Sequence, residues 1–196
     1  MTATTHPVQP ADRRSSTPRL DAADQPVSAA PLSRSSKLGQ VLGGLTRISL
    51  GWVFLWAFLD KAFGLGYATT SKDAWIDGGS PTFGFLSFGA AGPFKGAYHS
   101  IAGDAWADWL FMIGLLSIGI ALILGVFMNI AAAAGALLLL LMWTAVLPPE
   151  NNPVMDDHIV YALTLGLLAC LGAGRWLGLG RMWERTPLVQ KSALLR

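Results

Sequence analysis

The chain has 196 residues, of which 53% are apolar and 13% charged, and its mean hydropathy is +0.47. This balance is rare in small water-soluble domains and indicates a membrane protein. The formal net charge is only +2, and the cationic residues form no basic stripe with interleaved aromatics, so nucleic acid is excluded as a partner.

The amino-terminal segment, residues 1–36, is rich in Ser, Thr, Pro and Ala and contains four arginines. It has no periodic apolar pattern with which to bury itself, so we expect a disordered cytoplasmic tail. Arg13 and Arg14 do not make a twin-arginine signal, because the first apolar run starts far downstream.

Four apolar stretches follow, at residues 41–59, 109–127, 130–147 and 159–173. Each approaches the roughly 20 residues that a helix needs to cross the hydrocarbon core of a bilayer. Only Met128 and Asn129 separate the second stretch from the third, which predicts a tight helical hairpin. We therefore predict an all-α membrane protein, a four-transmembrane-helix bundle with a long outer loop between the first and second helices.

The long outer loop, residues 60–108, scatters aromatic residues among glycines and is too broken to form a span. Its aromatic content favours a position in the membrane interface or a lid over an apolar pocket. A surface loop anchored by aromatic side chains is the alternative. In the lid arrangement, Tyr98 and His99 would face the same pocket as His158.

The fourth stretch carries small residues at every fourth position, namely Ala162, Gly166, Cys170 and Gly174. Such a stripe predicts close approach to a neighbouring helix. Cys170 is then a packing residue and not a reactive thiol, since thiol reactivity needs an electropositive, accessible setting.

Lysines and arginines set the orientation of a membrane protein, because cationic loops resist translocation. Both terminal segments carry an excess of them, whereas the outer face has only Lys61, Lys72 and Lys95. We therefore predict a multi-pass plasma-membrane protein with both termini in the cytoplasm. Its parts would be the tail 1–36, the membrane domain 37–178 and a basic cytoplasmic tail 179–196.

The stretch PPENNPVMDDHIVYALTLG, residues 148–166, places ionisable groups at the outer mouth of the fourth span. Near the N-terminus of a helix, the carboxylates of Asp156 and Asp157 would be stabilised by the positive end of the helix dipole. This is the structural interpretation of the two residues. Helical spacing adds another, since Asp157, His158 and Tyr161 fall close together on one face. These three are candidate catalytic residues that relay protons beside a bound quinol. In the alternative interpretation, His158 is hydrogen-bonded to a loop carbonyl, and Tyr161 is an aromatic anchor at the membrane interface.

Charged and polar side chains supply the candidate substrate-binding residues. Lys61 ends the first span and is expected to pair with a carboxylate of the 150–157 loop, which would tie the first span to the fourth. Arg47 either snorkels to the cytoplasmic surface or meets an acceptor inside the bundle. The complete candidate set is Lys61, Glu150, His99, Lys95 and Arg47.

No metal or covalent cofactor is predicted. Cys170 is the only cysteine, which excludes an intramolecular disulfide, a CxxC pair and a thiolate-held cluster within the chain. The sequence also has no glycine-rich phosphate loop and no pair of histidines at i and i+4. Any electron carrier must therefore come from outside the chain.

Four motifs resemble the DoxX/DoxD family of small four-span membrane proteins. They are LGWVFLWAFLDKAFG (50–64), WIDGGSPTFGFL (75–86), GPFKGAYHSIAG (92–103) and PPENNPVMDDHIVYAL (148–163). The likeness covers about residues 41–175, and the long first loop is similar to the DoxD branch, the small subunit of thiosulfate:quinone oxidoreductase. The resemblance implies oxidation of thiosulfate to tetrathionate outside the membrane, with menaquinone or ubiquinone as diffusible electron acceptor and usually a second subunit.

The charge of the predicted outer face argues against thiosulfate, because three lysines there face eight carboxylates, a balance of minus five that repels a dianion. We predict a membrane subunit of a quinone-linked oxidoreductase, with the lipid bilayer, a quinone and a second subunit or further copies of the chain as partners. The alternative is a non-catalytic structural or assembly subunit that docks a partner redox enzyme. A transporter is disfavoured, because no broken helix marks a midplane site.

Overall fold

A computed structural model represents the protein and describes residues 1–2, 34–150 and 152–195. The predicted tail, residues 1–36, lies almost wholly outside the described residues. The chain divides into two units, and the second, Ser33–Arg196, contains every helix described below.

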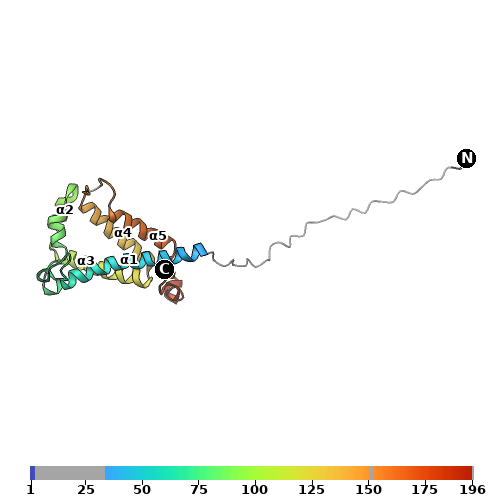
Figure 1. Cartoon of the computed structure of the whole chain (residues 1–196), viewed down its shortest axis with the longest axis horizontal. Helices are drawn as coiled ribbons and strands as arrows, with labels where there is room; N and C mark the ends of the chain where they lie inside the picture. Colours follow the sequence, from blue (N-terminus) through green and yellow to red (C-terminus); the bar gives the residue numbers. More distant parts are fainter. Residues whose placement is uncertain (3–33, 151, 196) are drawn as a thin grey trace. The chain divides into compact units, whose positions relative to one another are not determined.

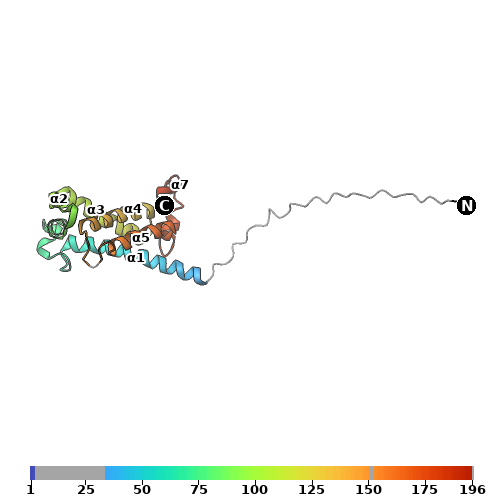
Figure 2. The ribbon, with the colours of Figure 1, turned by 90° about the horizontal axis from the view of Figure 1, so that it is seen from above.

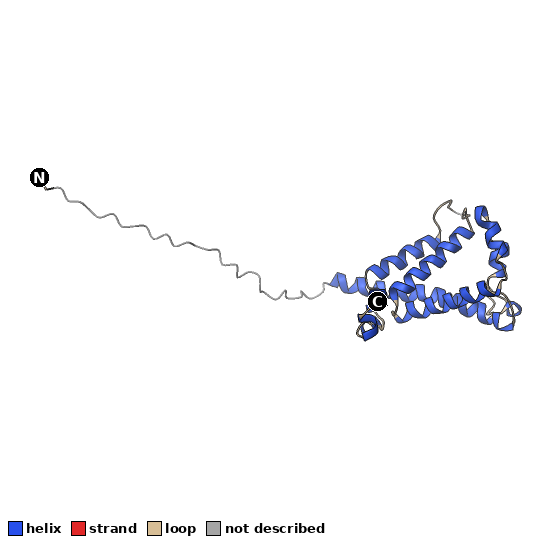
Figure 3. Ribbon diagram, turned by 180° about the vertical axis from the view of Figure 1, so that it is seen from behind, coloured by secondary structure: helices blue, strands red, loops and turns tan. Residues whose placement is uncertain are grey.

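All regular structure within the described residues is helical (Figure 3). The main helices are α1 (Arg34–Phe63), α3 (Ala105–Leu124), α4 (Met128–Ala145) and α5 (Asp157–Cys170). The first three contain segments of 28, 20 and 18 residues that are long and apolar enough to cross a membrane, whereas α5 has 14 residues. The prediction of an all-helical membrane protein is confirmed to this extent, with three candidate spans in place of four.

The connection between α3 and α4 consists of residues 125–127. Gly125 adopts a left-handed conformation with φ 75° and ends α3, while its N–H still bonds to the carbonyl of Ala121. The predicted hairpin is confirmed, but Met128 and Asn129 belong to α4 and not to the turn. A left-handed glycine stops a helix even where the apolar run continues. For this reason α3 ends at Leu124 and not at the end of the predicted run, residue 127.

α1 packs along α3 and α4 packs along α5, so that the α3–α4 connection joins two helix pairs (Figures 1 and 2). A Cβ added to Gly119 of α3 would lie 2.8 Å from the backbone nitrogen of Leu55 in α1. A Cβ on Gly135 of α4 would lie 2.8 Å from the side chain of Leu165 in α5. Each pair is therefore held at close range by a glycine at its crossing.

The small-residue stripe predicted for α5 is wrong at two positions. Gly166 and Cys170 are exposed, and a Cβ on Gly166 would meet no atom within 4 Å. The buried face of α5 consists of Ala162, Leu165 and Leu168. A spacing of four residues exceeds the helical repeat of 3.6, so a stripe with that spacing turns away from the neighbouring helix after one or two steps.

The two pairs diverge toward one end of the unit, the loop end, and approach each other at the opposite turn end (Figures 1 and 3). The loop end holds the segment between α1 and α3, residues 64–104, which we call the strap. No helix in it is long enough to span a membrane, as predicted. Its short elements are η1 (Ser71–Asp73), η2 (Trp75–Asp77), η3 (Phe85–Gly89), η4 (Gly92–Phe94) and α2 (Lys95–Ser100).

The turn end holds the α3–α4 connection and the C-terminal segment, whose α7 lies at the end of the unit away from α2 (Figure 2). The ring centroids of Trp183 and Phe127 are 4.4 Å apart, and the N–H of Leu179 donates to the carbonyl of Leu124 at 2.7 Å. Residues 179–195, predicted as a basic tail, therefore pack against the helices. Their elements, with the preceding turn, are η5 (Ala173–Arg175), α6 (Gly180–Trp183), α7 (Pro187–Gln190) and η6 (Ala193–Leu195).

Candidate functional site

Arg47 lies at the turn end, away from every other candidate residue, and is fully buried. Its guanidinium donates to the carbonyls of Leu122 and Ile123 at the end of α3, and to those of Trp176 and Leu177 at 2.9 and 3.1 Å. Of the two predicted alternatives, an acceptor inside the protein is therefore confirmed. Lys61 is 14 residues further along α1, or about 21 Å at 1.5 Å per residue, so Arg47 does not share a site with it.

The predicted cluster of Asp157, His158 and Tyr161 is brought together only in part. His158 Nδ1 lies 2.8 Å from a carboxylate oxygen of Asp156 and 3.6 Å from one of Asp157. Asp156 also accepts the N–H of Ile159 at 3.3 Å and so caps the N-terminus of α5. Tyr161 packs against the hydrophobic core and makes no hydrogen bond to this group within the described chain.

This arrangement favours a structural role for the start of α5. The partner of His158 is the capping carboxylate and not the loop carbonyl expected as the alternative. Asp156, Asp157 and His158 offer ligand atoms within 4.8 Å of one another, the spacing of a metal site. However, capping and the bond to His158 already account for the oxygens of Asp156.

The remaining substrate-binding candidates do not meet. Glu150, Lys95 and His99 are exposed side chains at the loop end. Across the described residues, no ion pair joins Lys61 to Glu150 or Asp157, so the predicted tie between the first and fourth spans is wrong. Lys61 instead lines a cavity between α3 and α4.

The cavity has a volume of about 470 Å³ and apolar walls. The strap forms part of its lining through Pro81, Phe85, Leu86 and Ile101, which agrees with the lid, one of the two predicted alternatives. Tyr98 lines the cavity as the lid arrangement predicts, but His99 and His158 do not. Most other lining residues come from the two helices. They are Trp106, Ala107, Leu110, Phe111, Gly114 and Ile118 of α3, and Ala134, Leu137, Leu138, Leu141 and Met142 of α4.

Hydrogen bonds attach the strap to α3. Asp108, in the first turn of α3, is 6% exposed, and one of its oxygens accepts the hydroxyl of Ser80 at 2.9 Å. The same oxygen accepts the backbone N–H and the hydroxyl of Thr82 at 3.0 and 2.6 Å. The wall of the cavity next to Thr82 is therefore fixed in place.

Hydrogen bonds also attach the strap to α4. The hydroxyl of Tyr98 lies 2.6 Å from that of Thr144 and donates to the carbonyl of Leu141 at 2.9 Å. The N–H of Ala91 donates to the carbonyl of Ala145 at 2.7 Å. Together with the bonds to Asp108, these contacts hold the strap across the divergent ends of α3 and α4.

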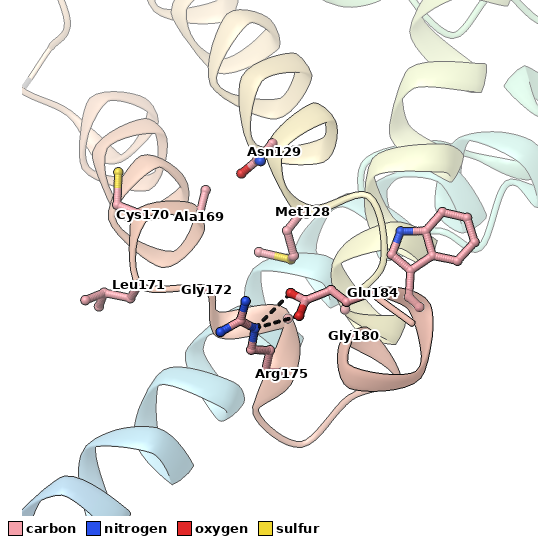
Figure 4. Close-up of a pocket in the computed structure, with 12 residues that line it drawn as sticks. Met128, Asn129, Ala169, Cys170, Leu171, Gly172, Arg175, Gly180 and Glu184 are labelled. Carbon is pink, nitrogen blue, oxygen red and sulfur yellow. Dashed lines mark hydrogen bonds and ion pairs between the residues drawn. The ribbon is translucent and has the colours of Figure 1, made fainter. Parts of the chain in front are cut away.

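A second, smaller cavity of about 250 Å³ lies at the turn end, between the start of α4, the end of α5 and α6 (Figure 4). Arg175 Nε donates to both carboxylate oxygens of Glu184, at 2.8 and 2.9 Å. This hydrogen bond and the charge of Glu184 raise the pKa of the Arg175 guanidinium above its ordinary value. The pair connects α6 to the segment after α5, which indicates a structural contact.

Asp108 and Thr82 shape the cavity but were not predicted from the sequence. An acid inside the first turn of a membrane helix needs a partner, so its position alone would have pointed to Asp108. No sequence signal identifies Thr82, which lies 26 residues away, as that partner.

No protein-family model, curated protein or solved structure matches the chain. The resemblance to the DoxX/DoxD family therefore stays a prediction from the four sequence motifs.

Proposed function

We propose that this chain is an integral membrane subunit that binds a quinone in the cavity between α3 and α4 and serves a quinone-linked oxidoreductase. The observation that carries the proposal is the cavity, with its volume of about 470 Å³, its apolar walls and a single cation in its lining. Small-molecule sites are typically apolar cavities of about 300–1,000 Å³ in which a few polar groups fix the orientation of the ligand.

The position of the cavity favours a ligand that dissolves in the bilayer. Leu110, Leu137 and Leu141 line it and are exposed side chains of α3 and α4. We infer that the cavity opens sideways between these two helices. The strap lies across the loop end, where water-soluble ligands would arrive. A quinone with an isoprenoid tail fits this route, because its tail can remain in lipid while the head enters the protein.

We infer that α5 also crosses the membrane, which completes a four-helix arrangement. Val160, Leu163 and Leu167 are exposed on α5, as expected of side chains that face lipid. The helix is about 21 Å long, so the residues on either side must complete the roughly 30 Å of hydrocarbon. Four crossings would put both termini on one side, in agreement with the cationic excess of both terminal segments.

The electron donor binds outside this cavity. Reduction of a quinone to a quinol takes two electrons and two protons, and oxidation of two thiosulfate ions to one tetrathionate releases two electrons. Thiosulfate is the donor that the family resemblance suggests. Transfer of a dianion from water into an apolar cavity is strongly unfavourable, so its site belongs on the loop-end surface or on a partner subunit.

Two glycines provide a matched test of the quinone site. Gly114 of α3 lines the cavity and Gly166 of α5 does not, and a Cβ on either would meet no atom within 4 Å. We expect short-chain ubiquinone and menaquinone analogues to raise the melting temperature of the purified wild type. Gly114→Phe should abolish that shift by filling the cavity, and Gly166→Phe should keep it.

The outcomes separate the two functional classes. If no analogue stabilises the wild type, the proposal fails and the docking subunit becomes the better interpretation. If Gly114→Phe and the wild type respond equally, the quinone binds elsewhere. Thiosulfate-dependent loss of quinone absorbance in proteoliposomes tests the donor separately, because quinone binding does not depend on which donor is used.

A further inference from the structure

Four side chains with hydrogen-bonding groups line the cavity, and three of them already have partners. The hydroxyl of Thr82 bonds to Asp108 at 2.6 Å, and that of Tyr98 bonds to Thr144 and to the carbonyl of Leu141. The indole N–H of Trp106 donates to Asp104 at 3.0 Å. Lys61 is the fourth, and its ammonium makes no hydrogen bond or ion pair within the described part of the chain. The cavity therefore contains one unsatisfied donor group.

The neighbouring carboxylate of Asp60 attracts Lys61 electrostatically but makes no hydrogen bond or ion pair with it. Asp60 is 2% exposed, and its two oxygens accept the backbone N–H groups of Tyr67 and Ala68 at 3.2 and 3.0 Å. Adjacent residues on a helix point in different directions, and Asp60 thereby fixes the start of the strap while Lys61 faces the cavity. A ligand in the cavity would therefore meet an ammonium whose N–H groups are not engaged by a carboxylate of the described chain.

We infer that Lys61 binds the quinone head, donating a hydrogen bond to a carbonyl oxygen and stabilising the anionic semiquinone. This inference rests on the proposed function and names the residue and the charged intermediate of that same site. Lysine suits the role because its ammonium is a compact charge on a flexible stem.

Reduction of the quinone in one-electron steps produces an anion that the ammonium of Lys61 can stabilise. One electron converts the quinone to a semiquinone anion, with the negative charge on its oxygens, and a second electron with two protons gives the quinol. The electrons come from a one-electron donor, a partner redox protein in the cell or a mediator dye in vitro. In apolar surroundings a fixed cation attracts the anionic form more strongly than the neutral one, so the semiquinone accumulates during reduction.

The test is a redox titration of the full chain in lipid nanodiscs loaded with a short-chain ubiquinone. Electron paramagnetic resonance measures the semiquinone, and solvent extraction measures the bound quinone in the same samples. We expect Lys61→Met to keep the quinone but lower the semiquinone stability constant by about tenfold or more, the effect of one lost charged hydrogen bond. Lys61→Arg should restore the signal. Lys72→Met is the control, because Lys72 lies on the strap outside the cavity lining.

Each outcome has a distinct meaning. Bound quinone without a semiquinone signal in the wild type, or with an equal signal in Lys61→Met, would overturn the inference and leave the proposed function intact. A wild type that retains no quinone would overturn the proposed function itself. If Lys61→Met does not fold, Lys61→Gln replaces it, and an undiminished signal from that neutral side chain would refute the role of the charge.

Discussion

Replacement of Arg47 tests whether this candidate binding residue is instead a structural clamp. Arg47→Met removes the guanidinium that joins the end of α3 to the segment after α5. The carbonyls of Leu122 and Ile123 belong to the last turn of α3, where no intrahelical N–H is available. The next carbonyl, that of Leu124, is already satisfied by the N–H of Leu179.

The expected cost follows from the four carbonyls that lose their donor. A buried acceptor left without a partner costs about 1–3 kcal/mol, and removal of a buried cation recovers part of its desolvation cost. We expect a net loss of about 3–5 kcal/mol in the free energy of unfolding, the range found when a buried charge contact is broken. That is a large share of the 5–15 kcal/mol typical of folded proteins.

Reversible unfolding in mixed micelles, followed by circular dichroism, measures this loss. Arg175→Met is the control, because its exposed ion pair with Glu184 should contribute only about 0–1 kcal/mol. A change of less than about 1 kcal/mol for Arg47→Met would refute the clamp. Folded Arg47→Met protein should still be stabilised by quinone, since Arg47 lies at the end of the unit away from the strap.

Three further variants test the loop end. Asp108→Ala removes the acceptor shared by Ser80 and Thr82 and should destabilise the protein by about 2–3 kcal/mol. Hydrogen exchange by mass spectrometry should then show faster exchange in residues 80–101, and unchanged protection there would contradict the attachment of the strap. His158→Gln should leave quinone binding and turnover intact, whereas Asp156→Ala should cost about 1 kcal/mol through loss of the α5 cap. Loss of turnover in a stable His158→Gln protein would restore the proton-relay hypothesis.

The membrane class and the helix positions could be predicted because they depend on local apolar content. The run at residues 109–127 identified α3, although the helix begins at Ala105 and ends at Leu124. The predicted start is four residues late because Asp108 interrupts the apolar pattern, and the predicted end is three residues late because Gly125 stops the helix inside that pattern. Such boundaries depend on single backbone conformations that hydropathy does not register.

The site was less predictable, because its residues meet only through tertiary structure. Arg47 binds carbonyls at least 75 residues away, and backbone acceptors leave no signature in the side-chain sequence. Lys61 is a predicted binding residue, yet within the described residues it makes no ion pair with a carboxylate of the 150–157 loop, its predicted partner. The cavity arises from the divergence of the two helix pairs, which no local pattern encodes.

The contrast between the two ends of the unit bears on where function resides. At the turn end, Arg47 donates to backbone carbonyls and Arg175 to Glu184. Gly125 and Gly174 allow the backbone segments there to approach each other closely. At the loop end, Asp60 and Asp108 hold the strap in place, and Lys61 lines an apolar cavity without a hydrogen bond or ion pair to any described residue. An unpaired cation beside hydrocarbon lowers stability, so a protein that retains one gains an advantage only when a ligand completes the contact. Substitution of Lys61 should therefore change ligand binding, whereas substitution of Arg47 or Asp108, whose partners lie within the protein, should change folding.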